Sequence, residues 1–374
     1  MEIQLDKTQV VNTFLALASI DNPSYNERNL SDEIQRHLIE LGTAFLEDDT
    51  YATTGGMAGN LYALCPGEID LPPLLFVTHM DSVGPAKNKH PVIHKDGTIT
   101  GSNNTILGAD NVAGITAVIE ALHYICQKRL PHRHIELIFS CAEEDYCRGM
   151  ELYKFRRIKS KEAYVVEAAG NIGECILRAT SAIPFQIQIT GLEKHAGFHP
   201  ELGVHAISIA AKAISELKLG KINKNTTVNI GSLQGGYGTD TYPFNCTICG
   251  EIRSYVHEEA LAELDNVKRT FQNIAEEHGA GIEMNSRIGG HSYELSEQEP
   301  VLQRFAKACE SHGILCKPRN SLDCNDANHF NEQGKQALAI SCGVQNPHSL
   351  KEYISTDQLV KSTELLVALM TSTE

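Results

Sequence analysis

The chain has 374 residues, which is long for a single hydrophobic core and predicts two domains. Its hydrophobic and charged fractions, 42% and 21%, are those of a soluble globular protein. The formal net charge of −15 at pH 7 argues against nucleic acid or an anionic membrane as a partner, because no basic face is available to neutralise phosphates.

The first 22 residues are amphipathic and lack the basic start and apolar core of a signal peptide. No uninterrupted apolar stretch approaches the ~20 residues that span a bilayer, so no membrane partner is expected. We therefore expect a cytoplasmic protein whose 11 cysteines are free thiols. Cys246 and Cys249 have C-x-x-C spacing, but the alternating residues around them predict a strand that points them to opposite faces, which favours packing over metal binding.

The first part of the chain alternates helices with short buried strands. Helical apolar spacing is found in 7–20, 29–42 and 110–125. Buried strands are predicted at 71–79, 135–140 and 163–167. This alternation predicts an α/β fold with a mostly parallel sheet and helices on both of its faces.

The pattern changes near residue 181. Residues 183–191 alternate like a half-buried antiparallel strand, and a β-α-β-β-α-β order continues from there. From about residue 300 the helix–strand rhythm returns. We therefore expect a discontinuous catalytic domain, 1–181 and 292–374, interrupted by an α+β ferredoxin-like domain at 182–291.

Acidic and histidine side chains follow several of these strands. His79 and Asp81 lie on the same side at the end of a strand, where Asp81 could fix the tautomer of a metal-bound histidine. An incidental surface pair is the alternative. Asp110 begins a helix after a glycine-containing turn, a place where an aspartate commonly caps the helix without any metal.

Glu143 and Glu144 are adjacent carboxylates directly after an apolar strand, and such carboxylates repel each other unless a cation or a proton relieves them. Metal hydrolases need one carboxylate to bind metal and another to take a proton from water. A solvated acidic turn, extended by Asp145, explains the pair equally well. The chain contains neither a G-x-S-x-G nucleophile elbow nor a phosphate-binding loop.

Two further residues, Glu167 and His348, complete a possible ligand set, because zinc accepts carboxylate oxygen and histidine nitrogen. Two metals need about five protein ligands when one ligand is shared. Five are available in His79, Asp110, Glu144, Glu167 and His348.

With these residues in place, the chain resembles the co-catalytic di-zinc peptidases and deacylases that include peptidase T, carboxypeptidase G and the aminoacylases. It is most similar to the peptidase T branch. The resemblance covers nearly the whole chain, and its motifs occur in the family's order: THMDSV, LGADNVAGITAVIEAL, SCAEE, GLEKHAGFHPELGVHAI, CGEIRS, DANHFNEQG and NPHSLKEYI. It implies two Zn²⁺ per subunit, and cobalt or manganese would accept the same ligands.

The resemblance also implies a role for each ligand. Asp110 would bridge both metals, with His79 and Glu167 on one metal and Glu144 and His348 on the other. Aspartate is usual at position 167 in the aminopeptidase branch, and glutamate is frequent there in the carboxypeptidase and deacylase branches.

Other residues would complete the chemistry. Glu143 would be the general base, and Asp81 would orient the first histidine ligand. A cis peptide bond would follow the bridging aspartate, at Asp110–Asn111. His195, from the inserted domain, would reach a neighbouring active site and steady the oxyanion; a surface histidine is the alternative reading of that residue.

The inserted domain would act as a lid and as the surface through which two subunits form a homodimer. Arg253 would grip a substrate carboxylate, for which a planar guanidinium is suited, and a surface arginine is the alternative. Asn328 and His329 lie where the family lines its substrate pocket. Asp240 stands where many relatives carry asparagine, and a carboxylate there would attract an ammonium group.

We therefore expect a metallopeptidase that hydrolyses short peptides and releases the N-terminal residue of tripeptides, with Glu143 activating the water. Because residue 167 is glutamate, an N-acyl amino acid deacylase or a carboxypeptidase remains an alternative within the family. A non-catalytic, metal-bound binding protein is the alternative outside it. That reading is disfavoured because no expected ligand or base is missing from the chain.

Overall fold

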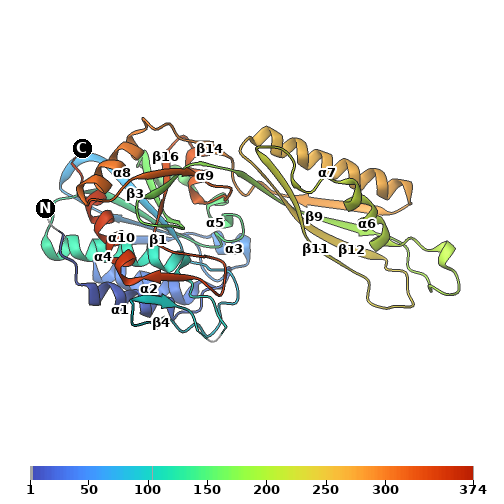
Figure 1. Cartoon of the computed structure of the whole chain (residues 1–374), viewed down its shortest axis with the longest axis horizontal. Helices are drawn as coiled ribbons and strands as arrows, with labels where there is room; N and C mark the ends of the chain where they lie inside the picture. Colours follow the sequence, from blue (N-terminus) through green and yellow to red (C-terminus); the bar gives the residue numbers. More distant parts are fainter. Residues whose placement is uncertain (1–2, 103, 374) are drawn as a thin grey trace. The chain divides into compact units, whose positions relative to one another are not determined.

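The computed structural model describes residues 3–102 and 104–373 of the chain. Their contacts divide them into two units, the second inserted into the first (Figure 1). Unit 1 contains the residues up to Arg178, Glu294–Ser321 and the chain from Asn325 onward. Unit 2 contains Ala179–Tyr293 and Leu322–Cys324.

The segment Leu322–Cys324 differs from the expectation, which placed it in the catalytic domain. It belongs to unit 2 because its backbone forms hydrogen bonds with residues of that unit. The carbonyl of Leu322 accepts hydrogen bonds from the hydroxyl of Thr180 at 2.7 Å and from Nη1 of Arg253 at 3.1 Å. These contacts span more than half of unit 2 along the sequence, so no local pattern could indicate them.

The centre of unit 1 is a nine-stranded sheet with the order β1-β2-β6-β3-β7-β16-β8-β14, in which β15 also pairs with β8. Its strands are β1 (Ala44–Glu47), β2 (Leu61–Cys65), β3 (Ile69–His79), β6 (Arg133–Ser140), β7 (Glu162–Ala168), β8 (Glu174–Ala179), β14 (Tyr293–Glu294), β15 (Lys317–Asn320) and β16 (Gln336–Ser341). The neighbours β6, β3, β7 and β16 run parallel, which confirms the mostly parallel centre. A separate three-stranded sheet contains β4 (Val92–Ile93), β5 (Thr98–Thr100) and β17 (Tyr353–Ser355).

Helices cover both faces of the nine-stranded sheet. They are α1 (Lys7–Ala18), α2 (Arg28–Glu40), α3 (Thr50–Thr54), α4 (Ala109–Lys128), α5 (Arg148–Glu151), η1 (Phe155–Arg157), α8 (Pro300–Ser311), α9 (Asp326–Glu332) and α10 (Thr356–Met370). Alternate residues of a strand face opposite sides of a sheet. In β3 both Phe76 and Val77 are buried, and Phe76 alone belongs to the large core cluster beneath α4 and α10. Helix α9 packs against β7 and β16.

Helix α4 lies close against β7 because a glycine faces the strand. A Cβ atom at Gly114 would lie only 2.1 Å from the carbonyl oxygen of Val166. The first turn of α4 is irregular, since Asp110 and Asn111 have non-helical dihedral angles. The peptide bond between these two residues is cis, as expected. Residues 110 and 111 are therefore held beside the carboxyl end of the sheet.

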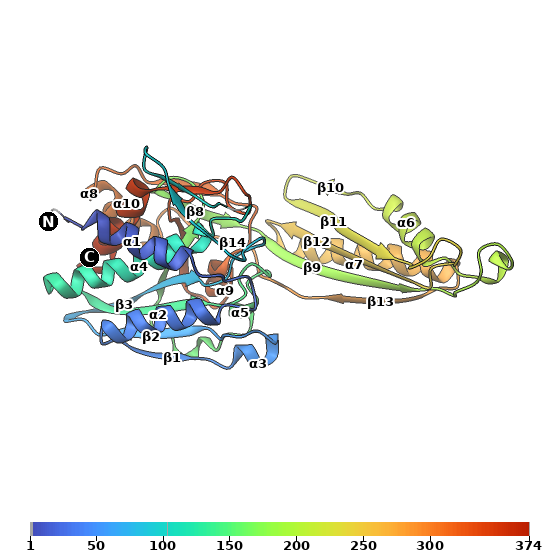
Figure 2. The ribbon, with the colours of Figure 1, turned by 90° about the horizontal axis from the view of Figure 1, so that it is seen from below.

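Unit 2 has the predicted β-α-β-β-α-β order, with one short strand added. Its antiparallel sheet runs β10-β11-β12-β9-β13, and Figure 2 shows the strands in this order from top to bottom. The elements are β9 (Ser181–Thr190), η2 (Pro200–Leu202), α6 (Ala206–Glu216), β10 (Gly220–Lys221), β11 (Thr226–Gly235), β12 (Asn245–Ser254), α7 (His257–Glu277) and β13 (Gly281–Ser286). Helices α6 and α7 pack against each other and against the sheet. Cys246 is fully buried in the core beneath them, whereas Cys249 is partly exposed, as the strand alternation predicts.

All 11 cysteines are free thiols in the structure. Within the described ranges, no helix has both the length and the apolar character required to cross a membrane.

Candidate active site

The carboxyl ends of three parallel strands bring the predicted ligands together. His79 is the last residue of β3 and pairs in register with Ser140, the last residue of β6. Glu143 and Glu144 follow the end of β6 after two residues, and Glu167 lies near the end of β7. Side chains at the carboxyl ends of neighbouring parallel strands share one edge of the sheet, where open α/β sheets place their ligand sites.

Asp110 lies between two histidines. Its Oδ1 is 3.2 Å from Nε2 of His79, and its Oδ2 is 3.4 Å from Nε2 of His348. The same nitrogen of His348 is 3.0 Å from Oε2 of Glu144. The side chain of Asp110 therefore faces the site and does not cap α4, whose N-cap is Gly108. His79 therefore lies beside one oxygen of the Asp110 carboxylate, and His348 together with Glu144 lies beside the other.

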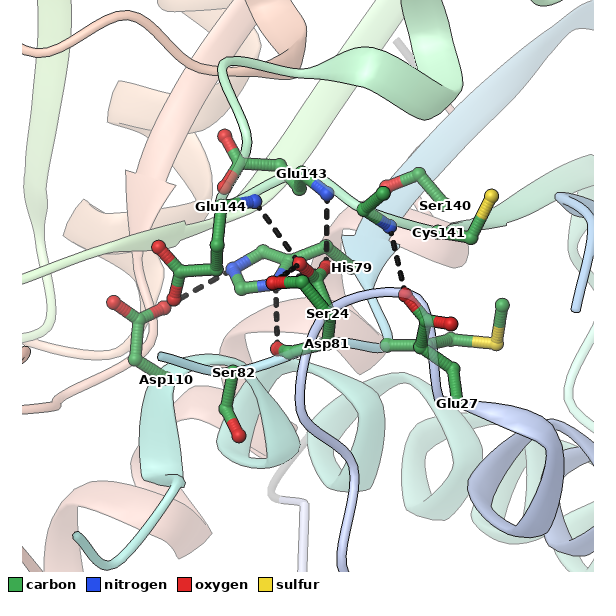
Figure 3. A network of polar contacts seen from close by, with 12 residues as sticks. Ser24, Glu27, His79, Asp81, Ser82, Asp110, Ser140, Cys141, Glu143 and Glu144 are labelled. Atoms are coloured by element: carbon green, nitrogen blue, oxygen red, sulfur yellow. Dashed lines mark hydrogen bonds and ion pairs between the residues drawn. The ribbon is translucent and has the colours of Figure 1, made fainter. Parts of the chain in front are cut away.

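Asp81 is fully buried, and its carboxylate makes four polar contacts, most of them drawn in Figure 3. Its Oδ1 accepts the backbone N–H of Glu143 at 2.9 Å, and its Oδ2 accepts that of Glu144 at 3.1 Å. Oδ2 also accepts the hydroxyl of Ser24 at 2.7 Å. Nδ1 of His79 lies 3.0 Å from the backbone carbonyl of Asp81 and 3.5 Å from its Oδ1. The pair His79 and Asp81 is thus part of a buried network and is not an incidental surface pair.

The side chains of the adjacent glutamates are buried and do not form a solvated turn. Glu143 is 8% exposed, and the side chain of Glu144 is 6% exposed. Burial raises the pKa of Glu143 well above its ordinary value, and the charge of Glu167 adds to this effect. Burial likewise raises the pKa of Glu144 and of Glu167. These carboxylates need a nearby cation or bound protons to offset the repulsion between their charges.

Two carboxylate oxygens support the presence of a cation at this place. Oε1 of Glu144 and Oε2 of Glu167 are buried without any hydrogen-bond partner. One ligand atom each from His79, Asp110 and Glu144 lie within 4.8 Å of one another. Unpartnered carboxylate oxygens beside two imidazole rings are the donor set that zinc and related divalent ions accept. The residues present therefore fit a metal centre.

The contacts between the two histidines and Asp110 raise the pKa of the histidines and lower the pKa of Asp110. Burial opposes the protonation of His79, but hydrogen bonds to Asp110 and Asp81 outweigh it and raise the His79 pKa well above its usual value. Hydrogen bonds to Asp110 and Glu144 raise the pKa of His348 to about 10. The Asp110 pKa is lowered, because its contacts with both histidines outweigh its burial. Without a metal, these shifts favour protonated histidines beside an ionised Asp110.

Sequence reasoning missed Glu352, which holds the turn before α4. Its carboxylate accepts the backbone N–H of Gly108 at 2.7 Å and that of Asp110 at 2.8 Å. Lys89 lies beneath this turn, since a Cβ at Gly108 would come 2.7 Å from its Nζ. Burial lowers the Lys89 pKa to about 8, and its ammonium group also binds the side chain of Asn22. Only the position of Glu352 in the NPHSLKEYI motif could have drawn attention to it.

Asp326 was also missed, although it lies in the DANHF motif. It is fully buried, and one ligand atom each from Asp326, Cys147 and Glu143 lie within 4.8 Å of one another. The Cys147 thiol donates to Oε1 of Glu143 at 3.3 Å. Burial raises the pKa of Asp326 to about 6. Asp326 therefore lies close to the expected base.

Two of the expected residues lie in paired loops of unit 2. His195 and Thr241 form a β-bridge, and the backbone N–H of Ala196 donates to the carbonyl of Asp240 at 2.7 Å. Both His195 and Asp240 are exposed. Nδ1 of His195 accepts the backbone N–H of Gly197 at 3.1 Å, so a neutral ring carries its proton on Nε2. His195 is thus prepared to donate a hydrogen bond from Nε2.

The other two predicted substrate residues already have protein partners. Nε of Arg253 donates to Glu251 at 3.1 Å, and its Nη1 lies 3.4 Å from Asp323. Asn328 is fully buried, and its Oδ1 accepts the backbone N–H of Asn325 at 3.0 Å in a capping box that begins α9. This contact accounts for Asn328 without a substrate, and the substrate-binding roles of both residues stay predictions.

Comparisons with known proteins agree over most of the chain. A model of peptidase family M20/M25/M40 matches residues 75–372, which include every site residue from His79 to His348. The chain is 30% identical over 366 residues to the uncharacterized protein YqjE of Bacillus subtilis, with 98% of each covered. Aminopeptidase PepT from Bacillus cereus is 32% identical with a TM-score of 0.84, and 98% of both chains is covered. A tripeptidase from Staphylococcus aureus is 27% identical with a TM-score of 0.89 and the same coverage.

Proposed function

Because the chain belongs to peptidase family M20/M25/M40 and is a metal-dependent peptidase, we propose that it releases the N-terminal residue of short peptides, preferably tripeptides. The observation that carries the mechanism is Asp110, whose two carboxylate oxygens face His79 and His348 separately. The aminopeptidase from Bacillus cereus and the tripeptidase from Staphylococcus aureus support the substrate class.

Two divalent ions would bind at this edge of the sheet. His79 and Glu167 would hold one, Glu144 and His348 would hold the other, and Asp110 would be shared. Zn²⁺ suits these nitrogen and oxygen ligands, as do Co²⁺ and Mn²⁺. When bound, such ions lower the pKa of water and polarise the scissile carbonyl.

Glu143 would transfer the proton in this reaction. Its carboxylate would accept a proton from the attacking water and then donate it to the leaving amine. The Asp81 carboxylate fixes the backbone N–H of Glu143, and so holds the base in relation to His79. This position allows one group to serve both proton transfers.

Unit 2 would supply the remaining contacts as a lid. His195 would donate its Nε2–H to the developing oxyanion of a neighbouring subunit in a homodimer, because its Nδ1 is already an acceptor. Asp240 would attract the substrate ammonium group, and Arg253 would bind its carboxylate. We place this reaction in the cytoplasm, where short peptides are the expected partners.

The first test replaces the base. Glu143→Gln should lower kcat on free tripeptides by about 10²–10⁴-fold while the protein retains its metal, because proton transfer contributes about this much. Glu310→Gln, an exposed change on α8, is the matched control and should keep full activity. Substantial activity in metal-loaded Glu143→Gln would eliminate the proposed role of Glu143.

A second test concerns the substrate. An aminopeptidase should cleave free tripeptides and reject the same peptides with an acetylated amine, because the blocked amine cannot carry the charge that Asp240 attracts. Efficient cleavage of acetylated amino acids would instead identify a deacylase. Release of the C-terminal residue of the free tripeptide would identify a carboxypeptidase.

The third test concerns the role of His195. Separately, Glu143→Gln and His195→Ala should both be nearly inactive. If His195 serves the neighbouring subunit, subunit exchange between the two variants creates one site with both residues intact, and activity returns. No recovery after confirmed exchange, or an active monomer by light scattering, would contradict this role.

A further inference from the structure

A second group of metal-binding side chains lies on unit 1, away from the active site. His37 and Glu40 are three residues apart on α2, so they share one face of that helix. His123 approaches them from α4, with its ring centroid 5.7 Å from that of His37 and an angle of 63° between the rings. One ligand atom from each of the three residues lies within 4.8 Å of the others.

Two imidazole nitrogens in this group lack the partners that burial requires. Nδ1 of His37 and Nε2 of His123 are both buried without a hydrogen bond. His37 is only 9% exposed, and Oε2 of Glu40 is 4.0 Å from its Nδ1. A buried nitrogen without a partner destabilises the folded protein, because it has lost its hydrogen bonds to water. A cation at this point would satisfy both nitrogens at once.

We propose that His37, Glu40 and His123 form a binding site for a divalent transition metal, distinct from the catalytic centre. Two imidazoles and one carboxylate are ligands for Zn²⁺, and the ligand atoms around a tetrahedral zinc are separated by about 3.3 Å. The ligand atoms of the three residues lie within 4.8 Å of one another, so side-chain rotations would have to bring them onto one ion. A water molecule would complete the coordination.

The charges around the group are consistent with such a site. Burial, followed by the charge of Arg36, lowers the pKa of His37, which favours the neutral ring that binds metal. Arg36 pairs with Oε1 of Glu40 and also with Glu33, which leaves Oε2 of Glu40 on the side of His37. Arg36 therefore competes with a metal for Glu40 but does not occupy the proposed position.

The site would join two helices of unit 1. Figure 1 and Figure 2 show α2 and α4 running alongside each other. Asp110 is at the start of α4 and His123 is 13 residues further on, which places them about 20 Å apart along the helix. The metal would therefore clamp α2 to α4 without touching the reacting groups, and its loss should leave catalysis intact.

The experiment counts bound metal. Protein stripped with a chelator is titrated with Zn²⁺ by calorimetry, and the wild type is compared with His123→Gln, which keeps a polar side chain of similar size. The wild type should bind one more equivalent of Zn²⁺ than His123→Gln. His278→Ala removes an exposed histidine of unit 2 and should bind as the wild type does. Tripeptide turnover by His123→Gln at saturating Zn²⁺ verifies that this variant is folded.

Two further variants change the affinity in opposite directions. Glu40→Gln should weaken the additional site by more than about tenfold, since even residues behind a ligand contribute about that much. Arg36→Gln should strengthen it, because the competitor for Glu40 is removed. Equal stoichiometry in the wild type and His123→Gln would overturn the proposal, and the two rings would then be a simple packing contact.

Discussion

Oδ1 of Asp81 accepts the backbone N–H of Glu143 at 2.9 Å, and the same oxygen lies 3.5 Å from the ring of His79. The carboxylate that is proposed to orient His79 therefore also fixes the backbone of the expected base. A metal-bound histidine usually donates its second N–H to such an oxygen, which sets its tautomer. Here Nδ1 of His79 has two acceptors on Asp81, the backbone carbonyl at 3.0 Å and Oδ1 at 3.5 Å (Figure 3).

Removal of Asp81 should consequently impair metal binding and catalysis together. Asp81→Ala leaves the N–H groups of Glu143 and Glu144 without their acceptors, and we expect kcat/KM to fall by more than about 100-fold with a loss of metal affinity. Asp81→Asn, which retains one carbonyl oxygen, should be less severe. Ser24→Ala removes only one donor to Asp81 and should have a small effect. Near-normal kcat/KM in Asp81→Ala would contradict this view.

Glu352 should control the position of Asp110 through its hydrogen bonds to the backbone at the start of α4. Glu352→Ala removes the acceptor for the N–H groups of Gly108 and Asp110, and the affinity for metal should fall by about 10–100-fold. Glu352→Gln keeps one oxygen acceptor and should lie between this variant and the wild type. Titration with a competing chelator measures the effect. If Glu352→Ala loses folding stability but binds metal normally, Glu352 supports only the fold.

Gly114 should be intolerant of any side chain. In Gly114→Ala the new Cβ would meet the Val166 carbonyl at 2.1 Å, so α4 must move away from β7. We expect the free energy of unfolding to fall by about 2 kcal/mol or more, measured by urea denaturation. Gly281→Ala is the matched control, because its Cβ would lie 3.6 Å from the nearest atom, Cβ of Thr190, and should change stability by less than about 1 kcal/mol.

His348 should make the metal-free protein depend on pH in a defined direction. Hydrogen bonds to Asp110 and Glu144 raise its pKa from 6.5 to about 10, so the folded state binds a proton more tightly than the unfolded state. This contribution is fully present below pH 6.5 and is lost as the pH rises through about 10. The stability difference between wild type and His348→Gln, measured with urea at several pH values without metal, should therefore shrink as pH rises. A constant difference would contradict the assignment.

Most elements of the fold could be predicted because their apolar residues repeat with a clear period. The run before His79 and the alternating stretch 183–191 correspond to β3 and β9. The cis peptide bond between Asp110 and Asn111 was expected from the family resemblance alone, whereas the non-helical dihedral angles at these two residues were not predicted. The position of Leu322–Cys324 in unit 2 depends on hydrogen bonds to Thr180 and Arg253, which are distant in sequence and leave no local signal.

The candidate site shows the same limit. His79, Glu143 and Glu144 could be selected because charged groups at strand ends are conspicuous after apolar residues. Glu352 could not, because its contacts with Gly108 and Asp110 cross 244 and 242 positions of sequence. Groups that bind metal carry a chemical signature in their residue type, whereas groups that hold a backbone in place can be almost any acceptor.

The strand order also has a consequence for synthesis of the protein. Strand β16 lies between β7 and β8, yet it follows both of them by more than 150 residues. Translation proceeds from the N-terminus. Strands β7 and β8 therefore cannot pair with β16, their common neighbour, until Ser341 has left the ribosome. His348, which is expected to bind metal, emerges later still. A growing chain therefore cannot bring all the residues of the candidate site together before residues 336–348 have been made.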